Sequence, residues 1–93
     1  MRILVVDDEL DIREFVQYNL VKEGYEVACA TNGREAVDMA LSFRPHLILM
    51  DMMMPEMDGR EACRTLRANP TTAKTMIIFL SAVCEEESLV ECY

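Results

Sequence analysis

The sequence has 93 residues, of which 52% are hydrophobic, and a formal net charge of -8 at pH 7. This length allows one domain, and the apolar content favours a packed core over a disordered chain. The negative charge argues against direct binding of nucleic acid, because that affinity comes largely from Lys and Arg at the phosphates. No apolar run approaches the ~20 residues of a membrane-spanning helix, and no signal peptide precedes the first apolar segment.

The cysteines follow no pattern that indicates a metal site or a disulfide framework. Cys29, Cys63, Cys84 and Cys92 include no C-x-x-C pair, and no neighbouring His completes a zinc set. A chain with this much aliphatic residue does not depend on disulfides for its stability. We therefore expect reduced thiols in a cytoplasmic protein.

The N-terminal part alternates between strand and helix patterns. Residues 3–6 form an aliphatic run that is too short for a helix and stops at Asp7 and Asp8, which predicts a strand buried on both faces. Between residues 9 and 23, apolar side chains recur at helical spacing, at Ile12, Phe15, Val16 and Leu20. Residues 25–29 alternate well enough to predict a second strand.

The middle of the chain repeats this alternation. Residues 31–33 supply turn and helix-capping chemistry before a second helical pattern, which ends near Pro45. Residues 47–50 form another fully apolar run, and this predicted strand also ends in an acid, Asp51.

The C-terminal part contains one further helix and one further strand before a polar segment. Residues 59–66 have helical spacing, residues 69–72 indicate a connection, and residues 76–80 predict a buried strand that ends in Ser81. Residues 85–93 begin with three glutamates, which favours the first turn of a helix.

Strand and helix thus alternate four times, which is typical of an α/β fold with a parallel sheet and helices on both faces. In such a sheet the carboxyl ends of all strands line one edge, where ligands bind. The side chains that follow the apolar strands are therefore expected at one edge; these are Asp7, Asp8, Asp51 and Ser81.

Three carboxylates at one edge would repel one another strongly unless a cation lay among them. Magnesium suits a site made of a few carboxylates, a backbone carbonyl and water. A carboxylate can also attack phosphorus to form an acyl phosphate, and Asp51 is our candidate because the apolar strand before it fixes its position. Asp7 and Asp8, at a strand-to-helix turn, are then the candidate metal ligands. Ser81 can donate its hydroxyl to a phosphoryl oxygen.

A simpler interpretation assigns these acids no chemistry. Asp7 and Asp8 would only cap the first helix, and Asp51 would only open a loop. That interpretation suffices for any one acid, but it weakens when three acids and a hydroxyl share one sheet edge.

Three segments carry a resemblance to a known family. They read V-V-D-D-E at residues 5–9, L-I-L-M-D-M-M-M-P-E-M-D-G at residues 47–59 and F-L-S-A at residues 79–82. In order and spacing they resemble the signature segments of response-regulator receiver domains of two-component systems. The resemblance implies a flavodoxin-like sheet with strand order 2-1-3-4 and a single receiver domain over residues 1–93.

The resemblance also implies roles for individual residues. Asp51 would accept a phosphoryl group from the phosphohistidine of a sensor histidine kinase. Asp8 would bind Mg²⁺ directly, Asp7 would bind it chiefly through water, and Met53 would contribute its backbone carbonyl. Ser81 would be the switch hydroxyl that meets the phosphoryl oxygen. Ala82 would belong to the residues that bind the phosphoryl group, because its small side chain would leave room for that group.

The C-terminal end departs from the family pattern, in which a fourth helix, a fifth strand and a fifth helix usually follow. The expected domain is truncated, with the fifth strand and fifth helix missing, and so is the lysine that ends that strand. The lysines present, Lys22 and Lys74, fall in a predicted helix and a connection. Residues 76–80 would then form an open edge through which two copies could pair.

These patterns leave two functions open. The first is a phosphoryl-accepting signalling module, not an enzyme, that responds to a histidine kinase. The alternative is a truncated receiver fragment that binds Mg²⁺ and self-associates through its open edge without signalling. A phosphatase with an aspartyl nucleophile would need a second acid two residues after Asp51, where Met53 stands.

Overall fold

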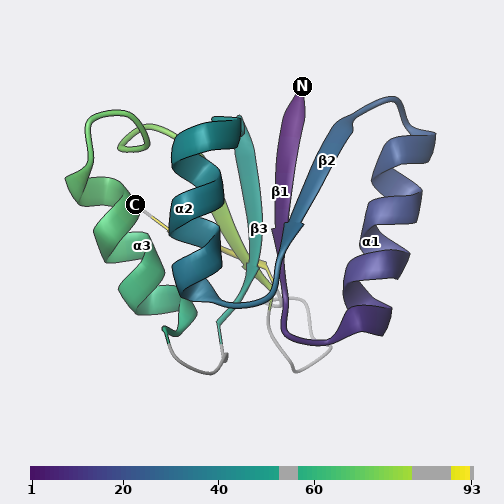
Figure 1. Cartoon of the computed structure of the whole chain (residues 1–93), viewed down its shortest axis with the longest axis horizontal. Coiled ribbons are helices and arrows are strands. Elements are labelled where there is room, and N and C mark those ends of the chain that lie inside the picture. Colours follow the sequence, from purple (N-terminus) through teal and green to yellow (C-terminus); the bar gives the residue numbers. More distant parts are fainter. Residues whose placement is uncertain (53–56, 81–88, 93) are drawn as a thin grey trace.

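The computed structural model describes residues 1–52, 57–80 and 89–92. Its strands form one sheet between two layers of helices (Figure 1). The elements in chain order are β1 (Arg2–Val6), α1 (Leu10–Lys22), β2 (Glu26–Ala30), α2 (Gly33–Phe43), β3 (Leu47–Asp51), α3 (Gly59–Ala68), β4 (Met76–Leu80) and β5 (Leu89–Cys92). Among the described residues, no helix is long and apolar enough to span a bilayer.

The sheet has the order β2-β1-β3-β4-β5. β1 to β4 are parallel, which confirms the predicted α/β class and the order 2-1-3-4. α2 and α3 cover one face of the sheet and α1 lies against the other (Figure 1). The carboxyl ends of the four parallel strands consequently lie along one edge.

The expectations for the C-terminal segment were wrong in two respects. Residues 89–92 form a strand, β5, and not part of a helix, and β5 pairs antiparallel with β4 from Ile77 to Leu80. β4 is therefore paired on both sides and offers no open edge. The physical reason is that an unpaired strand leaves a row of backbone N–H and C=O groups that a nearby segment can bind.

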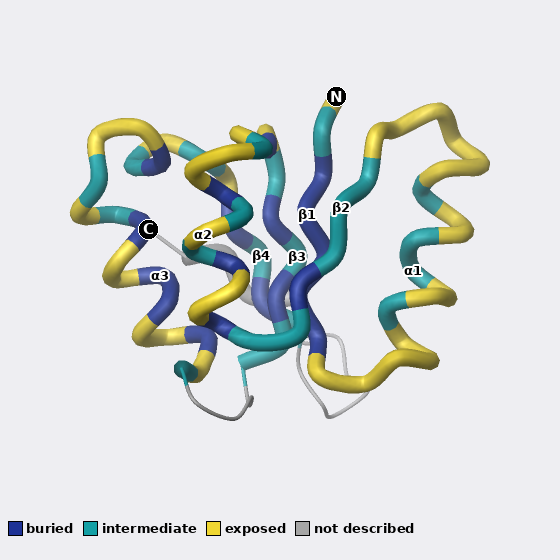
Figure 2. Tube along the Cα trace, viewed as in Figure 1, coloured by how far each residue is buried: buried dark blue, intermediate teal, exposed yellow. Residues whose placement is uncertain are grey.

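The main core lies between the sheet and the pair α2 and α3. Alternate side chains of β1, β3 and β4 point into it and are almost fully buried; these are Leu4, Val6, Ile48, Met50, Ile77 and Phe79. The helices contribute small residues at the contact, Ala36, Ala40 and Ala62, which let them approach the sheet closely. Figure 2 shows the buried strands between helices whose outer sides are exposed.

α1 packs less completely than its sequence pattern predicts. Val16 and Leu20 are partly buried, but Phe15 is 71% exposed, and no residue of this helix is fully buried. Apolar side chains occur all around α1, so no orientation of the helix can bury all of them.

The sulfur chemistry also differs from the expectation of reduced thiols. Cys63, buried in α3, is disulfide-bonded, whereas Cys29 of β2 is free. Sequence spacing does not reveal which thiols lie within bonding reach, because that depends on Cα separations set by the fold.

Side chains cap two helices at the ends nearest the carboxyl edge of the sheet. Asn32 accepts a hydrogen bond from the N–H of Glu35 at 2.8 Å, and Asp58 accepts one from the N–H of Glu61 at 2.9 Å. The Glu35 carboxylate in turn accepts from the N–H and the hydroxyl of Thr31, the residue before the cap, at 2.8 and 2.9 Å. These bonds confirm the capping chemistry predicted for residues 31–33.

Backbone hydrogen bonds from two glycines hold the residues on either side of the segment that follows β3. The N–H of Gly59 donates to the carbonyl of Met52, and the N–H of Gly33 donates to the carbonyl of Met57, both at 3.0 Å. A Cβ added at Gly59 would lie 2.7 Å from Cε1 of Phe79 and 2.9 Å from the carbonyl oxygen of Asp51. The close approach of α3 to the end of β3 therefore requires glycine at this position.

We predict that Gly59→Ala lowers the free energy of unfolding by about 1–3 kcal/mol, because the added methyl group overpacks the end of β3. Urea unfolding followed by circular dichroism measures the change. Arg60→Ala is the matched control at an exposed position of the same turn, where a change within about 0.5 kcal/mol is expected. Alanine otherwise stabilises a helix relative to glycine, so a neutral or stabilising Gly59→Ala would contradict this packing argument.

Candidate functional site

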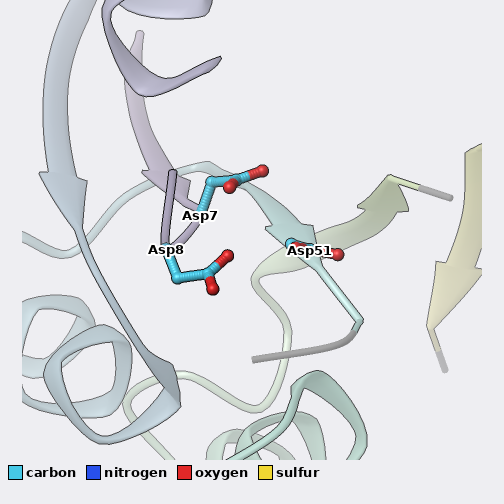
Figure 3. Close-up of side chains that lie close together, drawn as sticks. All are labelled: Asp7, Asp8 and Asp51. Atoms are coloured by element: carbon cyan, nitrogen blue, oxygen red, sulfur yellow. The ribbon is translucent and has the colours of Figure 1, made fainter. Parts of the chain in front are cut away.

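Three acids converge where β1 and β3 end. The two strands are parallel neighbours in which Val6 stands opposite Met50, so Asp7 follows β1 at the level of Asp51 in β3. Asp7, Asp8 and Asp51 each offer one carboxylate oxygen, and these oxygens all lie within 4.8 Å of one another. Figure 3 shows the three side chains gathered beside the ends of the two strands. The predicted acidic edge is therefore present.

Asp7 is the most constrained of the three acids. It is only 3% exposed, and its N–H donates to the carbonyl of Ala30 at 3.2 Å. Its Oδ1 accepts from the N–H of Glu9 at 2.8 Å, and its carbonyl accepts from Nη1 of Arg13 at 2.7 Å. The side chain of Asp8, in contrast, is exposed, and that of Asp51 is half-buried. The cluster thus runs from the protein interior to solvent.

The electrostatics of the cluster raise the pKa of Asp7 above its ordinary value. Burial is the largest cause, and the nearby carboxylates of Asp51 and Asp8 add to it. The hydrogen bond from the N–H of Glu9 and the charge of Arg13 act in the opposite direction. A carboxyl group whose pKa is higher in the folded than in the unfolded protein binds protons more tightly when folded, so its ionisation destabilises the fold as pH rises through that range.

The donor set fits a hard divalent cation. Carboxylate oxygens are the ligands that Mg²⁺ prefers, and a doubly positive ion would offset the repulsion that raises the pKa of Asp7. Two oxygens bound to one Mg²⁺ are at most ~4.2 Å apart, given its bond lengths of about 2.1 Å. A group of oxygens within 4.8 Å of one another therefore reaches this geometry by a small adjustment, or with water between the ion and one acid.

The other predicted site residues are not placed. Met53, Ser81 and Ala82 lie outside the residues that the structure describes. Of the predicted set, the structure brings together the three acids, and the roles assigned to the remaining residues rest on the resemblance alone.

The sequence pattern did not single out Arg13, although this residue contacts the cluster. Its backbone N–H donates to the carbonyl of Glu9 in the first turn of α1, while its guanidinium reaches back to the carbonyl of Asp7. The sequence feature that could have indicated this contact is a basic side chain in the first turn of the helix that follows Asp7 and Asp8.

A parallel sheet of order 2-1-3-4 with carboxylates after β1 and at the end of β3 defines a flavodoxin-like receiver fold. Residues 3–93 match the family model of the response regulator receiver domain. The chain belongs to this family, whose members are signalling modules of two-component systems, not enzymes.

Individual relatives agree with this assignment. The chain is 40% identical over 90 residues to the regulatory protein AtoC of Escherichia coli K12. The matched region covers 97% of this chain but only 19% of AtoC. Among solved structures, the chemotaxis response regulator CheY4 of Vibrio cholerae matches with a TM-score of 0.84 and 36% identity. That match covers 92% of this chain and 72% of CheY4.

The N-terminal domain of a response regulator receiver protein from Methanoculleus marisnigri JR1 gives a similar result. It matches with a TM-score of 0.85 and 32% identity, over 94% of this chain and 72% of its own. Similarity to these proteins shows the family and the fold of the chain. It does not show that the chain has the activity of the whole AtoC protein, because the chain spans only 19% of AtoC.

We predict that Asp7→Asn raises the free energy of unfolding without metal and reduces the stabilisation by Mg²⁺. Asparagine removes the buried charge but keeps an oxygen that can accept from the N–H of Glu9. For the wild type, Mg²⁺ at 100 times its dissociation constant should add about 2.7 kcal/mol. Urea unfolding with and without magnesium chloride measures both effects.

Asp38→Asn is the matched control, because it makes the same charge change at an exposed position of α2 outside the cluster. It should leave the Mg²⁺ effect intact. An Asp7→Asn protein that is less stable without metal, or that gains as much from Mg²⁺ as the wild type, would show that charge crowding does not govern this site.

Proposed function

We propose that the chain is the phosphoryl-accepting module of a two-component phosphorelay, in which a sensor histidine kinase phosphorylates Asp51 in a Mg²⁺-dependent reaction. One observation supports this most directly: the carboxylates of Asp7, Asp8 and Asp51 converge at the carboxyl edge of the sheet. The membership of the chain in the receiver family supplies the reaction class.

In the proposed reaction, a carboxylate oxygen of Asp51 attacks the phosphorus of the kinase phosphohistidine. The new O–P bond forms as the P–N bond breaks, and the electron pair of that bond leaves with the imidazole. Pairing of Asp51 with Leu80 in the β3–β4 ladder holds the nucleophile in place from the backbone. Bound Mg²⁺ would neutralise charge on the transferring group.

The chain's own residues divide the remaining roles. Asp8, exposed beside Asp51, is the proposed direct metal ligand, and the buried Asp7 acts chiefly through water. Met53 would supply its backbone carbonyl, Ser81 its hydroxyl to the phosphoryl oxygen, and Ala82 the space beside it. These last three roles rest on the matching motif positions.

The proposal also covers the setting of the domain. We propose that residues 1–93 act as a single receiver domain, that its partner is a histidine kinase and not nucleic acid, and that it works in the cytoplasm. A net charge of -8 supports the exclusion of nucleic acid as a direct partner.

The alternative, a receiver fragment that binds Mg²⁺ without signalling, has one specific observation in its favour. Lys22 lies in the last turn of α1, and Lys74 precedes β4, so both are at the amino edge of the sheet, far along the strands from the acids. No lysine therefore stands at the acidic edge in the described part of the chain. The open edge that this alternative also required is occupied by β5.

We predict that wild-type protein incubated with Mg²⁺ and acetyl phosphate gains one phosphoryl group by intact-mass spectrometry. Asp51→Asn should abolish this gain. Asp58→Asn is the matched control, because it removes an acid near the same loop while asparagine still caps α3. Phosphorylation that persists in Asp51→Asn would contradict the assignment of the acceptor. Wild-type protein that binds Mg²⁺ without being modified would favour the alternative.

A further inference from the structure

Arg13 joins the first helix to the turn that carries the metal-binding acids. Its Nη1 donates to the backbone carbonyl of Asp7 at 2.7 Å, a short bond in which the donor is charged. This carbonyl belongs to the peptide group that links Asp7 to Asp8. The guanidinium therefore restrains the orientation of the peptide plane to which Asp8 is attached.

The contact completes a set of three restraints on Asp7. The N–H of this residue is bound to Ala30 in β2, and its carboxylate is bound by the N–H of Glu9. Without Arg13 the carbonyl would lose its charged partner, and the peptide between the two acids could rotate more freely. If the turn can rotate, metal binding must first order the two carboxylates, and the entropy lost in this ordering weakens binding. Two carboxylates that are already held in place bind the ion more tightly.

We propose that Arg13 is a positioning residue of the divalent metal site, which holds the Asp7–Asp8 turn in the conformation that binds the ion. This role rests on the proposed function of the acidic cluster. Arg13 does not touch the phosphoryl group or the metal; it acts through Asp7.

An opposing effect must be weighed, because a guanidinium also repels a divalent cation. If Arg13 were bound to a carboxylate oxygen, it would compete with the metal for that ligand. The hydrogen bond instead goes to a neutral backbone oxygen, so it orders the turn without occupying a metal ligand. The repulsion acts across a partly solvated edge, where the exposed Asp8 shows that water is present to weaken it. We therefore expect positioning to outweigh repulsion.

The two effects change the Mg²⁺ affinity in opposite directions, which makes them separable by experiment. Isothermal titration with magnesium chloride gives the dissociation constant of the 93-residue chain and its variants. Arg13→Met, which removes both the charge and the donor, should weaken Mg²⁺ binding about 10-fold. Arg13→Lys, which keeps a charged donor, should restore part of the loss.

Lys22→Met is the matched control, because it makes the same charge change at the far end of the same helix. It should leave the dissociation constant unchanged within about twofold. Unfolding in urea is measured in parallel, and titrations are made where each variant is folded. If Arg13→Met does not fold, Arg13→Gln takes its place, and weaker binding is again expected.

The outcomes distinguish this inference from the proposed function. Mg²⁺ binding that is unchanged or tighter in Arg13→Met or Arg13→Gln, with or without a loss of stability, would overturn the positioning role and leave the metal site standing. Wild-type protein that takes up no Mg²⁺ would overturn the metal site itself, and with it the role of Arg13 there.

Discussion

The mutual repulsion of three carboxylates at the end of an apolar sheet is the constraint on which the rest of this structure depends. Two carboxylates about 4 Å apart repel by about 4 kcal/mol at an effective dielectric constant of 20. Each fully buried aliphatic side chain contributes about 1.5–3 kcal/mol. The strands that hold the acids contain several such side chains, including Leu4, Val6 and Ile48, so the core can hold the acids together.

The local structure around the acids reduces this repulsion without neutralising them. Asp7 is buried, yet it receives a hydrogen bond from the N–H of Glu9 and lies near the charge of Arg13, both of which favour its ionised form. The raised pKa of Asp7 shows that these contacts offset only part of the cost of burial and crowding. The remaining negative charge is what would attract the proposed divalent cation to this edge.

The sequence predicted those parts of the fold that depend on local pattern, and it failed where distant segments meet. Short apolar runs, the first followed by Asp7 and Asp8 and the second by Asp51, were sufficient to predict strands and a shared acidic edge. The pairing of residues 89–92 with β4 was missed, because the glutamates before them favour a helix locally while the strand depends on a partner elsewhere in the chain. The contact of Arg13 with Asp7 was missed because it depends on the path of the backbone from β1 into α1, which the sequence pattern does not define.

The different environments of the acids are consistent with the two roles proposed for the cluster, metal binding and phosphoryl acceptance. A nucleophile needs solvent access to meet a phosphoryl donor, whereas a residue that fixes geometry benefits from burial, which limits its motion. Asp51 is half-buried at the end of its strand and Asp8 is exposed, while Asp7 is held on three sides inside the protein. Parallel strands of nearly equal length place these residues at one level, but the turn after β1 gives Asp7 and Asp8 opposite exposures. Adjacent residues in the sequence can therefore differ in role because the backbone between them turns away from the core.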